Sequence, residues 1–163
     1  MRWLLGLFIF AFLLLAAGIL YQYAGGLRDR RRFLHRGRRV KIANGQWLYL
    51  CERGTVGPTI VFEAGIGATS LNWQRLQEDL AGAARTVTYD RGGLGWSNGR
   101  CCTERTPSNI ATELHQVLQA AQIEPPYLLV GHSFGSLVVR RFAVKYPNEV
   151  SGVVLVDPMR PEE

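Results

Sequence analysis

The first part of the chain is almost entirely apolar, whereas the rest alternates between apolar and polar positions. From Trp3 to Tyr23 no side chain carries a charge. At about 1.5 Å per residue, a helix over this segment would be roughly as long as the 30 Å hydrocarbon core of a bilayer is thick. Trp3, Tyr21 and Tyr23 stand at its ends, where amphipathic aromatic rings prefer the membrane interface. The pattern predicts a transmembrane anchor within residues 1–26.

A cleaved signal peptide is the alternative interpretation of this segment. Arg2 would be its charged start, and Leu15-Ala16-Ala17 would supply small residues for cleavage. The apolar core of a signal peptide is usually about 7–15 residues long, which is shorter than the run seen here. The length therefore favours the anchor.

Beyond residue 41, short apolar runs alternate with segments of helical periodicity. Asn44-Gly45 is a strong signal for a hairpin turn and predicts two strands between residues 39 and 52. Strands that are apolar on both faces and alternate with helices are typical of a mostly parallel sheet with flanking helices. We expect residues 42–163 to form an α/β domain of about six strands. The further elements are strands at 59–63, 86–90, 127–130 and 150–156, and helices at 71–80, from Pro107 to Ala121 after a Thr106 cap, and from Gly135 to Tyr146.

The positive charge of the chain is concentrated in one segment. Residues 27–41 contain eight arginines and lysines and one aspartate, although the net charge of the whole chain is only +6. Basic residues beside an apolar span indicate membrane topology and attraction to anionic lipid head groups. By the positive-inside rule, this juxtamembrane segment places the soluble domain in the cytoplasm, behind a single-pass anchor. A nucleic-acid patch is the alternative, but no interleaved aromatic residues accompany the charges, so we expect no nucleic-acid partner.

One short motif carries the candidate chemistry. Gly131-His132-Ser133-Phe134-Gly135 lies between an apolar run and a helical pattern, which is the strand–turn–helix arrangement of a nucleophile elbow. Such a corner forces its central residue into a sparsely populated backbone conformation and lifts the side chain clear of both elements. Glycines two positions before and after the corner leave room for strand and helix to approach. The motif predicts Ser133 as a nucleophile at a helix N-terminus, where developing negative charge is favoured.

Four motifs, in order and at similar spacing, resemble the α/β-hydrolase-1 family. The resemblance extends from about Val40 to Asp157. It implies an α/β-hydrolase sheet of about eight strands, of which about six are present here, and a small-molecule or lipid-like acyl substrate. The four motifs are Glu63-Ala-Gly-Ile-Gly67, Asp90-Arg-Gly-Gly-Leu-Gly-Trp-Ser97, Pro126-Tyr-Leu-Leu-Val-Gly-His-Ser-Phe-Gly-Ser136 and Tyr146-Pro-Asn-Glu-Val-Ser-Gly-Val-Val-Leu-Val-Asp157.

The resemblance also implies the parts of an acyl-transfer site. Ser133 would be the nucleophile, and the backbone N–H groups of Ile66 and Phe134 would form the oxyanion hole. The family often has a His-Gly pair in the loop after the third strand, whereas this chain has Ala64-Gly65, which leaves the backbone donor available. No cofactor and no metal is implied.

The histidine of a catalytic triad is the main departure from the family. In α/β-hydrolases the acid and then the histidine follow the serine, but no histidine follows Ser133 in this sequence. His35 lies in the basic segment, and His115 is expected on a helix surface. His132 adjoins the serine at a corner where neighbouring side chains point apart. We therefore expect an amino-terminal fragment that lacks its catalytic acid and histidine.

The remaining acids and cysteines add little chemistry. Asp90 and Asp157 end apolar runs, and both are expected to be turn residues rather than catalytic acids. The cysteines, which are Cys51, Cys101 and Cys102, show no metal-binding spacing, and their odd number fits a reducing compartment.

Together these patterns favour a membrane-anchored serine hydrolase acting on ester, lipid or amide bonds. Without a base, this chain alone is expected to lose most of the triad's rate advantage and to be inactive. One alternative is a catalytically inactive, membrane-anchored hydrolase-like protein. Another is an acyltransferase or a cofactor-free haloperoxidase, because the fold does not fix the reaction.

Overall fold

The computed structural model describes residues 2–33, 36–98 and 104–160 of the 163-residue chain. The chain divides into two compact units, Met1–Arg36 and Gly37–Glu163. His35, Cys101 and Cys102 lie outside the described residues.

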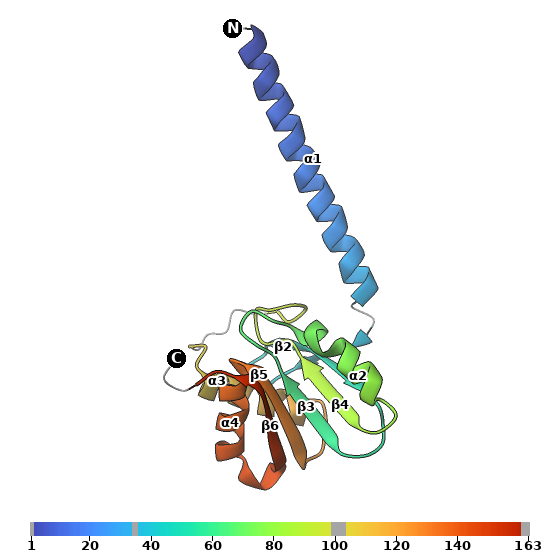
Figure 1. Cartoon of the computed structure of the whole chain (residues 1–163), viewed down its shortest axis with the longest axis vertical. Helices are drawn as coiled ribbons and strands as arrows, with labels where there is room; N and C mark the ends of the chain where they lie inside the picture. The colour runs from blue at the N-terminus through green and yellow to red at the C-terminus, as the bar shows by residue number, and fades with distance from the viewer. Residues whose placement is uncertain (1, 34–35, 99–103, 161–163) are drawn as a thin grey trace. The chain divides into compact units, whose positions relative to one another are not determined.

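The first unit is a single helix, α1 (Arg2–Phe33) (Figure 1). Within Trp3–Asp29 the mean hydropathy reaches 2.6 with no residue buried, so α1 is long and apolar enough to cross a membrane. A signal sequence near the N-terminus would meet the same criteria. The expected helix is present, but it continues beyond residue 26 into the basic segment, where arginine is a good helix former.

Six strands form one mixed sheet in the second unit (Figure 1). Their order across the sheet is β1-β2-β4-β3-β5-β6. β2 is antiparallel to both β1 and β4, whereas the pairs β4–β3, β3–β5 and β5–β6 are parallel. The expectation of a mostly parallel sheet is confirmed. The strands are β1 (Arg38–Lys41), β2 (Trp47–Arg53), β3 (Thr59–Glu63), β4 (Arg85–Tyr89), β5 (Tyr127–Ser133) and β6 (Val150–Pro158).

The predicted hairpin joins β1 and β2. Gly45 N donates to Ile42 O, and Ile42 N donates to Gln46 O, both at 2.9 Å. Gly45 has a φ of 84°, in the left-handed region that this turn requires and that glycine adopts without a steric penalty.

Among the described residues, helical segments connect the strands, and those expected at 71–80, 107–121 and 135–146 are present. The short 3₁₀ helix after Tyr146 was not predicted. The segment expected at 71–80 begins as a 3₁₀ turn and then becomes α-helical. Thr106 caps its helix as predicted, since its hydroxyl accepts from Asn109 N at 3.2 Å. The segments are η2 (Ser70–Trp73) with α2 (Gln74–Leu80), α3 (Pro107–Ala120), α4 (Gly135–Lys145) and η3 (Pro147–Glu149).

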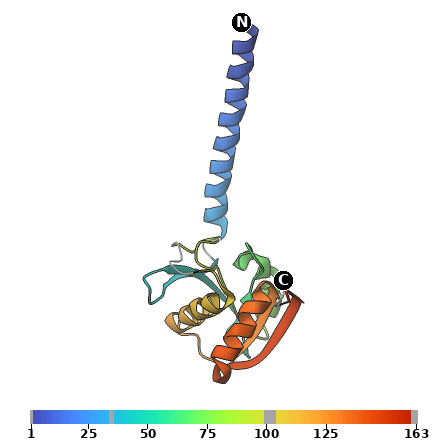
Figure 2. The same ribbon diagram turned by 90° about the vertical axis from the view of Figure 1, so that its left-hand side faces the viewer.

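Helices cover both faces of the sheet (Figure 2). Along β3 the side chains alternate between two apolar clusters. Val61 joins the larger cluster with α3 and α4, whereas Ile60 and Phe62 join a smaller cluster against Trp73 and Leu80. The three central residues of β3, Ile60 to Phe62, are therefore buried on both faces of the sheet, as their sequence indicates.

Candidate active site

Ser133 occupies a tight corner between β5 and α4. Its φ is 51°, in the left-handed region, while Phe134 already has a helical φ of −53°. A non-glycine residue in this conformation costs about 1–3 kcal/mol and persists only where its surroundings hold it. The predicted strand–corner–helix geometry is therefore present, with Ser133 as the strained residue.

The two glycines of the motif provide the space for this corner. A Cβ on Gly131 would lie 2.7 Å from Gly135 O and 2.7 Å from a methyl carbon of Val139. A Cβ on Gly135 would lie 2.5 Å from Glu63 O and 2.6 Å from Ala64 O. Because real side chains do not make such contacts, only glycine lets α4 approach both β5 and the end of β3.

The loop after β3 lies directly against the corner. A Cβ on Gly65 would be 3.6 Å from Ser133 Cβ and 3.1 Å from His132 Nδ1. Ile66, the next residue, has a side chain that is largely exposed. The structure thus brings the loop that contains Ile66 beside Ser133 and Phe134, so that all three predicted site residues belong to one region at the carboxyl ends of β3 and β5.

A cavity of about 240 Å³ opens next to this corner. Its walls come from the loop after β3 and from η2, β5 and β6. The His132 ring stands edge-on to Trp73, with ring centroids 6.4 Å apart and an interplanar angle of 83°. Gly65 lines this cavity and also lies against Ser133, so a group bound in the cavity would be close to the Ser133 side chain. The lining residues are Ala64, Gly65, Asn72, Trp73, His132 and Val156.

Neither described histidine is placed as a base. Across residues 2–33, 36–98 and 104–160, no side chain makes a hydrogen bond to the Ser133 hydroxyl. His132 points toward Trp73 and the cavity rather than being paired with the serine.

His115 corrects one prediction, because it is not a surface residue. Its side chain is only 12% exposed, its Nε2 lies 3.0 Å from Glu149 Oε1, and its ring stacks on Tyr146 with centroids 3.8 Å apart. Both partners lie more than thirty positions later in the chain, so helical spacing alone could not identify them. The contacts join α3 to the end of α4 and have no connection to Ser133.

A buried ionic network beneath the loop is the feature that sequence reasoning missed. Arg91 Nε donates to Glu63 Oε1 at 2.7 Å, and Tyr89 Oη donates to Glu63 Oε2 at 2.6 Å. The Arg91 and Glu63 side chains are 5% and 1% exposed. The only signal was that two charged residues stand at the ends of apolar strand segments, Glu63 directly after Phe62 and Arg91 two positions after Tyr89.

The groups of this network change one another's pKa values. Burial raises the pKa of the Glu63 carboxyl, although Arg91 and the Tyr89 hydroxyl oppose the rise. Burial lowers the pKa of the Arg91 guanidinium, but the attraction of Glu63 outweighs it and the net shift is upward. Arg91 is therefore a permanent buried cation, as an arginine paired with a carboxylate should be.

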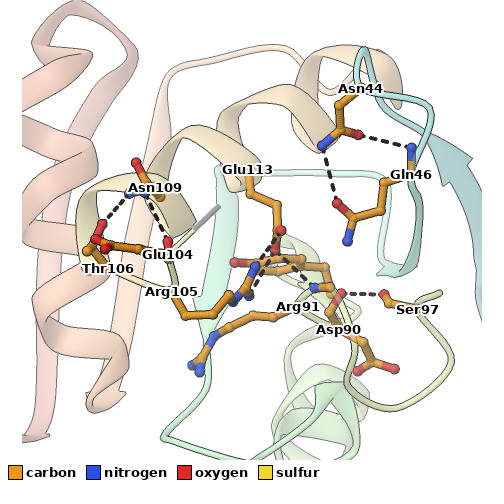
Figure 3. Close-up of polar contacts among 12 residues, drawn as sticks. Asn44, Gln46, Asp90, Arg91, Ser97, Glu104, Arg105, Thr106, Asn109 and Glu113 are labelled. Carbon is orange, nitrogen blue, oxygen red and sulfur yellow. Dashed lines mark hydrogen bonds and ion pairs between the residues drawn. The ribbon is translucent and has the colours of Figure 1, made fainter. Parts of the chain in front are cut away.

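Glu113 extends the polar network from α3. It accepts hydrogen bonds from Gly92 N at 3.0 Å and from Arg105 Nη1 at 2.7 Å (Figure 3). The hydrogen bond from Gly92 anchors the start of the glycine-rich turn that follows Arg91 to the helix α3.

Asp90 lies in the loop directly after β4, as expected, whereas Asp157 lies within β6, because the pairing of this strand with β5 continues to Pro158. Asp90 is fully buried and accepts from Ser70 N at 2.7 Å and Trp96 N at 2.9 Å. Burial raises the Asp90 pKa, against the opposing effect of these backbone donors. Asp157 is exposed with a φ of 44°, immediately before Pro158. No three His, Cys, Asp or Glu side chains within the described ranges gather as a metal site.

Comparison with known proteins agrees with this geometry. Residues 58–163 match the family model described as the alpha/beta hydrolase fold. The chain is 42% identical over 106 residues to the uncharacterised protein YqjL of Bacillus subtilis (strain 168), which covers 65% of this chain and 42% of YqjL. It is 32% identical over 120 residues to an AB hydrolase superfamily protein of Gibberella zeae, covering 71% of this chain and 37% of that protein.

Among solved structures, the chain resembles a membrane phospholipase A described as a bacterial virulence factor. The TM-score is 0.74 at 26% sequence identity, and the match covers 97% of this chain and 52% of the phospholipase chain. The chain thus spans about half of that structure and about two fifths of the curated relatives. The matched family model, the mostly parallel sheet and the glycine-flanked corner at Ser133 together show that the chain belongs to the α/β-hydrolase family.

Proposed function

We propose that this chain is the anchored, nucleophile-bearing part of a serine hydrolase that cleaves ester, lipid or amide bonds. The observation that carries the proposal is the strained φ of 51° at Ser133 beside the Gly65–Ile66 loop. A fold gains nothing from strain at this corner, whereas a nucleophile gains an exposed hydroxyl at the N-terminus of α4.

In the proposed reaction, Ser133 Oγ attacks the acyl carbon and its proton passes to a base. Negative charge then develops on the carbonyl oxygen, where the N–H groups of Ile66 and Phe134 would stabilise it. The acid and the base would be supplied from beyond Ser133 in a longer protein, in the order typical of the family. The two-fifths coverage of the curated relatives supports this interpretation.

The proposed substrate is a lipid-like or small acyl compound at a membrane. The apolar helix α1, the basic residues 27–41 and the likeness to a membrane phospholipase A support this assignment. We propose α1 as a single-pass anchor with the catalytic unit in the cytoplasm, because the basic flank lies on its carboxyl side. A cleaved signal peptide is the competing assignment, and cell fractionation with amino-terminal sequencing separates the two.

Active-site labelling tests the proposed chemistry. A fluorophosphonate probe should form a covalent adduct at Ser133 in the longer protein and a much weaker one in the 163-residue chain. Ser133→Ala should abolish the adduct, while Ser151→Ala, at an exposed serine of β6, should leave it unchanged. An adduct on another residue, or none in the longer protein, would contradict a hydrolase.

An inactive hydrolase-like protein is the second candidate. It is favoured by the lack of a hydrogen-bonded base at Ser133 among the described residues. Ester turnover by the 163-residue chain that disappears in Ser133→Ala would exclude it.

A further inference from the structure

The Arg91 side chain holds three consecutive residues at the end of β3. Its guanidinium donates to the Glu63 carboxylate at 2.7 Å, to the carbonyl oxygen of Ala64, and to that of Gly65 at 3.0 Å. These residues immediately precede Ile66, whose N–H is the proposed oxyanion donor. The buried cation therefore lies directly behind the oxyanion loop.

The geometry of the peptide bond connects this contact to the donor. Gly65 C=O and Ile66 N–H belong to one planar trans peptide unit, in which the two groups point in opposite directions. When Arg91 fixes the direction of Gly65 O, it also fixes the direction of Ile66 N–H, away from the guanidinium. A loop with two glycines would otherwise let this plane rotate.

The second donor residue touches the same side chain. Arg91 Cζ lies 5.2 Å from the centre of the Phe134 ring, within the range of a cation–π contact. Phe134 N–H is the other proposed donor. One arginine thus contacts the loop that carries the first donor and the side chain of the residue that carries the second.

Arg91 is itself held in place. Its Nε is paired with Glu63, and the second oxygen of Glu63 is occupied by Tyr89 Oη at 2.6 Å. A planar guanidinium presents its donors on three separate nitrogens and so reaches a carboxylate and two carbonyl groups together, whereas the three donors of a lysine ammonium all lie on one nitrogen.

We propose that Arg91 is the positioning residue of the oxyanion hole, which sets the Gly65–Ile66 peptide plane and supports Phe134. This inference rests on the proposed function, because it assigns Arg91 to the same site. It predicts that Arg91→Lys, which keeps the charge, still disturbs the donor geometry.

The test compares Arg91→Lys with Arg85→Lys in the full chain in detergent micelles. Arg85 is a suitable control, because it is the first residue of β4, at the end of that strand opposite to Arg91, and its guanidinium is paired with Glu52 of β2 at 2.6 Å. Carbonyl ¹³C and amide ¹⁵N resonances of Gly65 and Ile66 should shift in Arg91→Lys and stay unchanged in Arg85→Lys. Unchanged resonances in Arg91→Lys would overturn the inference, whatever the activity of the chain.

Labelling kinetics supply the second measurement, on the longer protein. In Arg91→Lys the maximal rate of fluorophosphonate labelling at Ser133 should fall about 10- to 100-fold, less than the ~10²–10³ of deleting one oxyanion donor. The concentration for half-maximal labelling should stay within about twofold, because ground-state binding does not use the donors. Shifted resonances with a wild-type labelling rate would also overturn the inference.

Two arms separate the possible failures. If the wild-type longer protein is not labelled, the hydrolase proposal fails while the resonances still test Arg91. If Arg91→Lys shows no thermal unfolding transition, the double variant Glu63→Gln, Arg91→Gln replaces it, since it leaves no unpaired buried charge. The same shift and the same loss of labelling are then expected.

Discussion

Gly135 and Glu63 lie so close that a Cβ on residue 135 would stand 2.5 Å from the Glu63 carbonyl oxygen. The helix α4 therefore packs on the end of β3 backbone to backbone, directly behind Ser133. Gly135→Ala should lower the free energy of unfolding by about 1–3 kcal/mol, because neither backbone can move without disturbing the corner.

Thermal unfolding of the full chain in detergent measures this loss. Gly82→Ala is the matched control, since no atom lies within 4 Å of its added Cβ and its φ is not in the left-handed region. Equal melting temperatures for the two variants would show that α4 is not held by this contact.

Ser133→Gly should be more stable than Ser133→Ala by about 1 kcal/mol. Glycine adopts the φ of 51° without the steric cost that serine and alanine both bear. The order should reverse at Ser151, on strand β6 with an ordinary φ, where glycine is the less stable substitution. Chemical denaturation of all four variants gives the comparison. If alanine proves better at both positions, the corner is not strained.

Tyr89→Phe should reduce the free energy of unfolding by about 1.5–3 kcal/mol, the range for hydrogen bonds to charged groups. The Tyr89 hydroxyl donates to the buried Glu63 carboxylate, which would lose one of its two partners. Tyr127→Phe removes a bond of the same length, 2.6 Å, to the neutral carbonyl of Ile123, and should cost only about 0.5–1.5 kcal/mol. A larger loss at Tyr127 would contradict a charged Glu63.

Glu52 predicts one pH dependence of stability. Burial raises the pKa of Glu52, but the hydrogen bonds and the positive charges of Arg85 and Arg38 together outweigh burial. The pKa of Glu52 therefore lies below its ordinary value. Because the pKa of Glu52 is lower in the folded protein than in the unfolded chain, the ionised carboxylate stabilises the fold at pH values above the unfolded-state pKa. This stabilisation is lost as the pH falls through the folded-state pKa. Glu52→Gln should therefore be less stable than wild type at neutral pH, and the difference in stability should vanish at pH values below the folded-state pKa of Glu52.

Melting curves at a series of pH values test the prediction. Asp79→Asn serves as control, because the Arg75–Asp79 pair is exposed at 3.6 Å and should contribute little at any pH. If the difference in melting temperature between wild type and Glu52→Gln persists in acid, the ion pairs of Glu52 are not what stabilises the wild type.

The sequence was sufficient where local rules decide the structure. Asn44-Gly45 predicts the hairpin, the apolar run Ile60–Phe62 predicts a strand buried on both faces, and Thr106 with Pro107 predicts the start of α3. Each signal depends on residues a few positions apart, so periodicity and turn chemistry determine them. The same holds for the corner at Ser133, whose glycines lie two positions away.

The contacts that the sequence could not predict depend on which strands become neighbours. Arg91 reaches Glu63 because β3 and β4 pair in parallel, with Phe62 opposite Thr88, so that the two strand ends lie side by side. His115 is mostly buried because η3 places Glu149, and the end of α4 places Tyr146, against α3. Neither contact produces a periodic pattern in the sequence. Charged residues at the ends of apolar strands do indicate that a buried ion pair could form there.

The conformation of Ser133 affects which residue selection for stability would favour at this position. Gly131 and Gly135 are required for packing in this protein, because a Cβ at either position would collide with neighbouring atoms. The serine at the corner is not required for packing, because glycine at position 133 would give a more stable protein. Selection for folding alone would therefore remove the hydroxyl, and its retention among relatives would be a record of selection for chemistry.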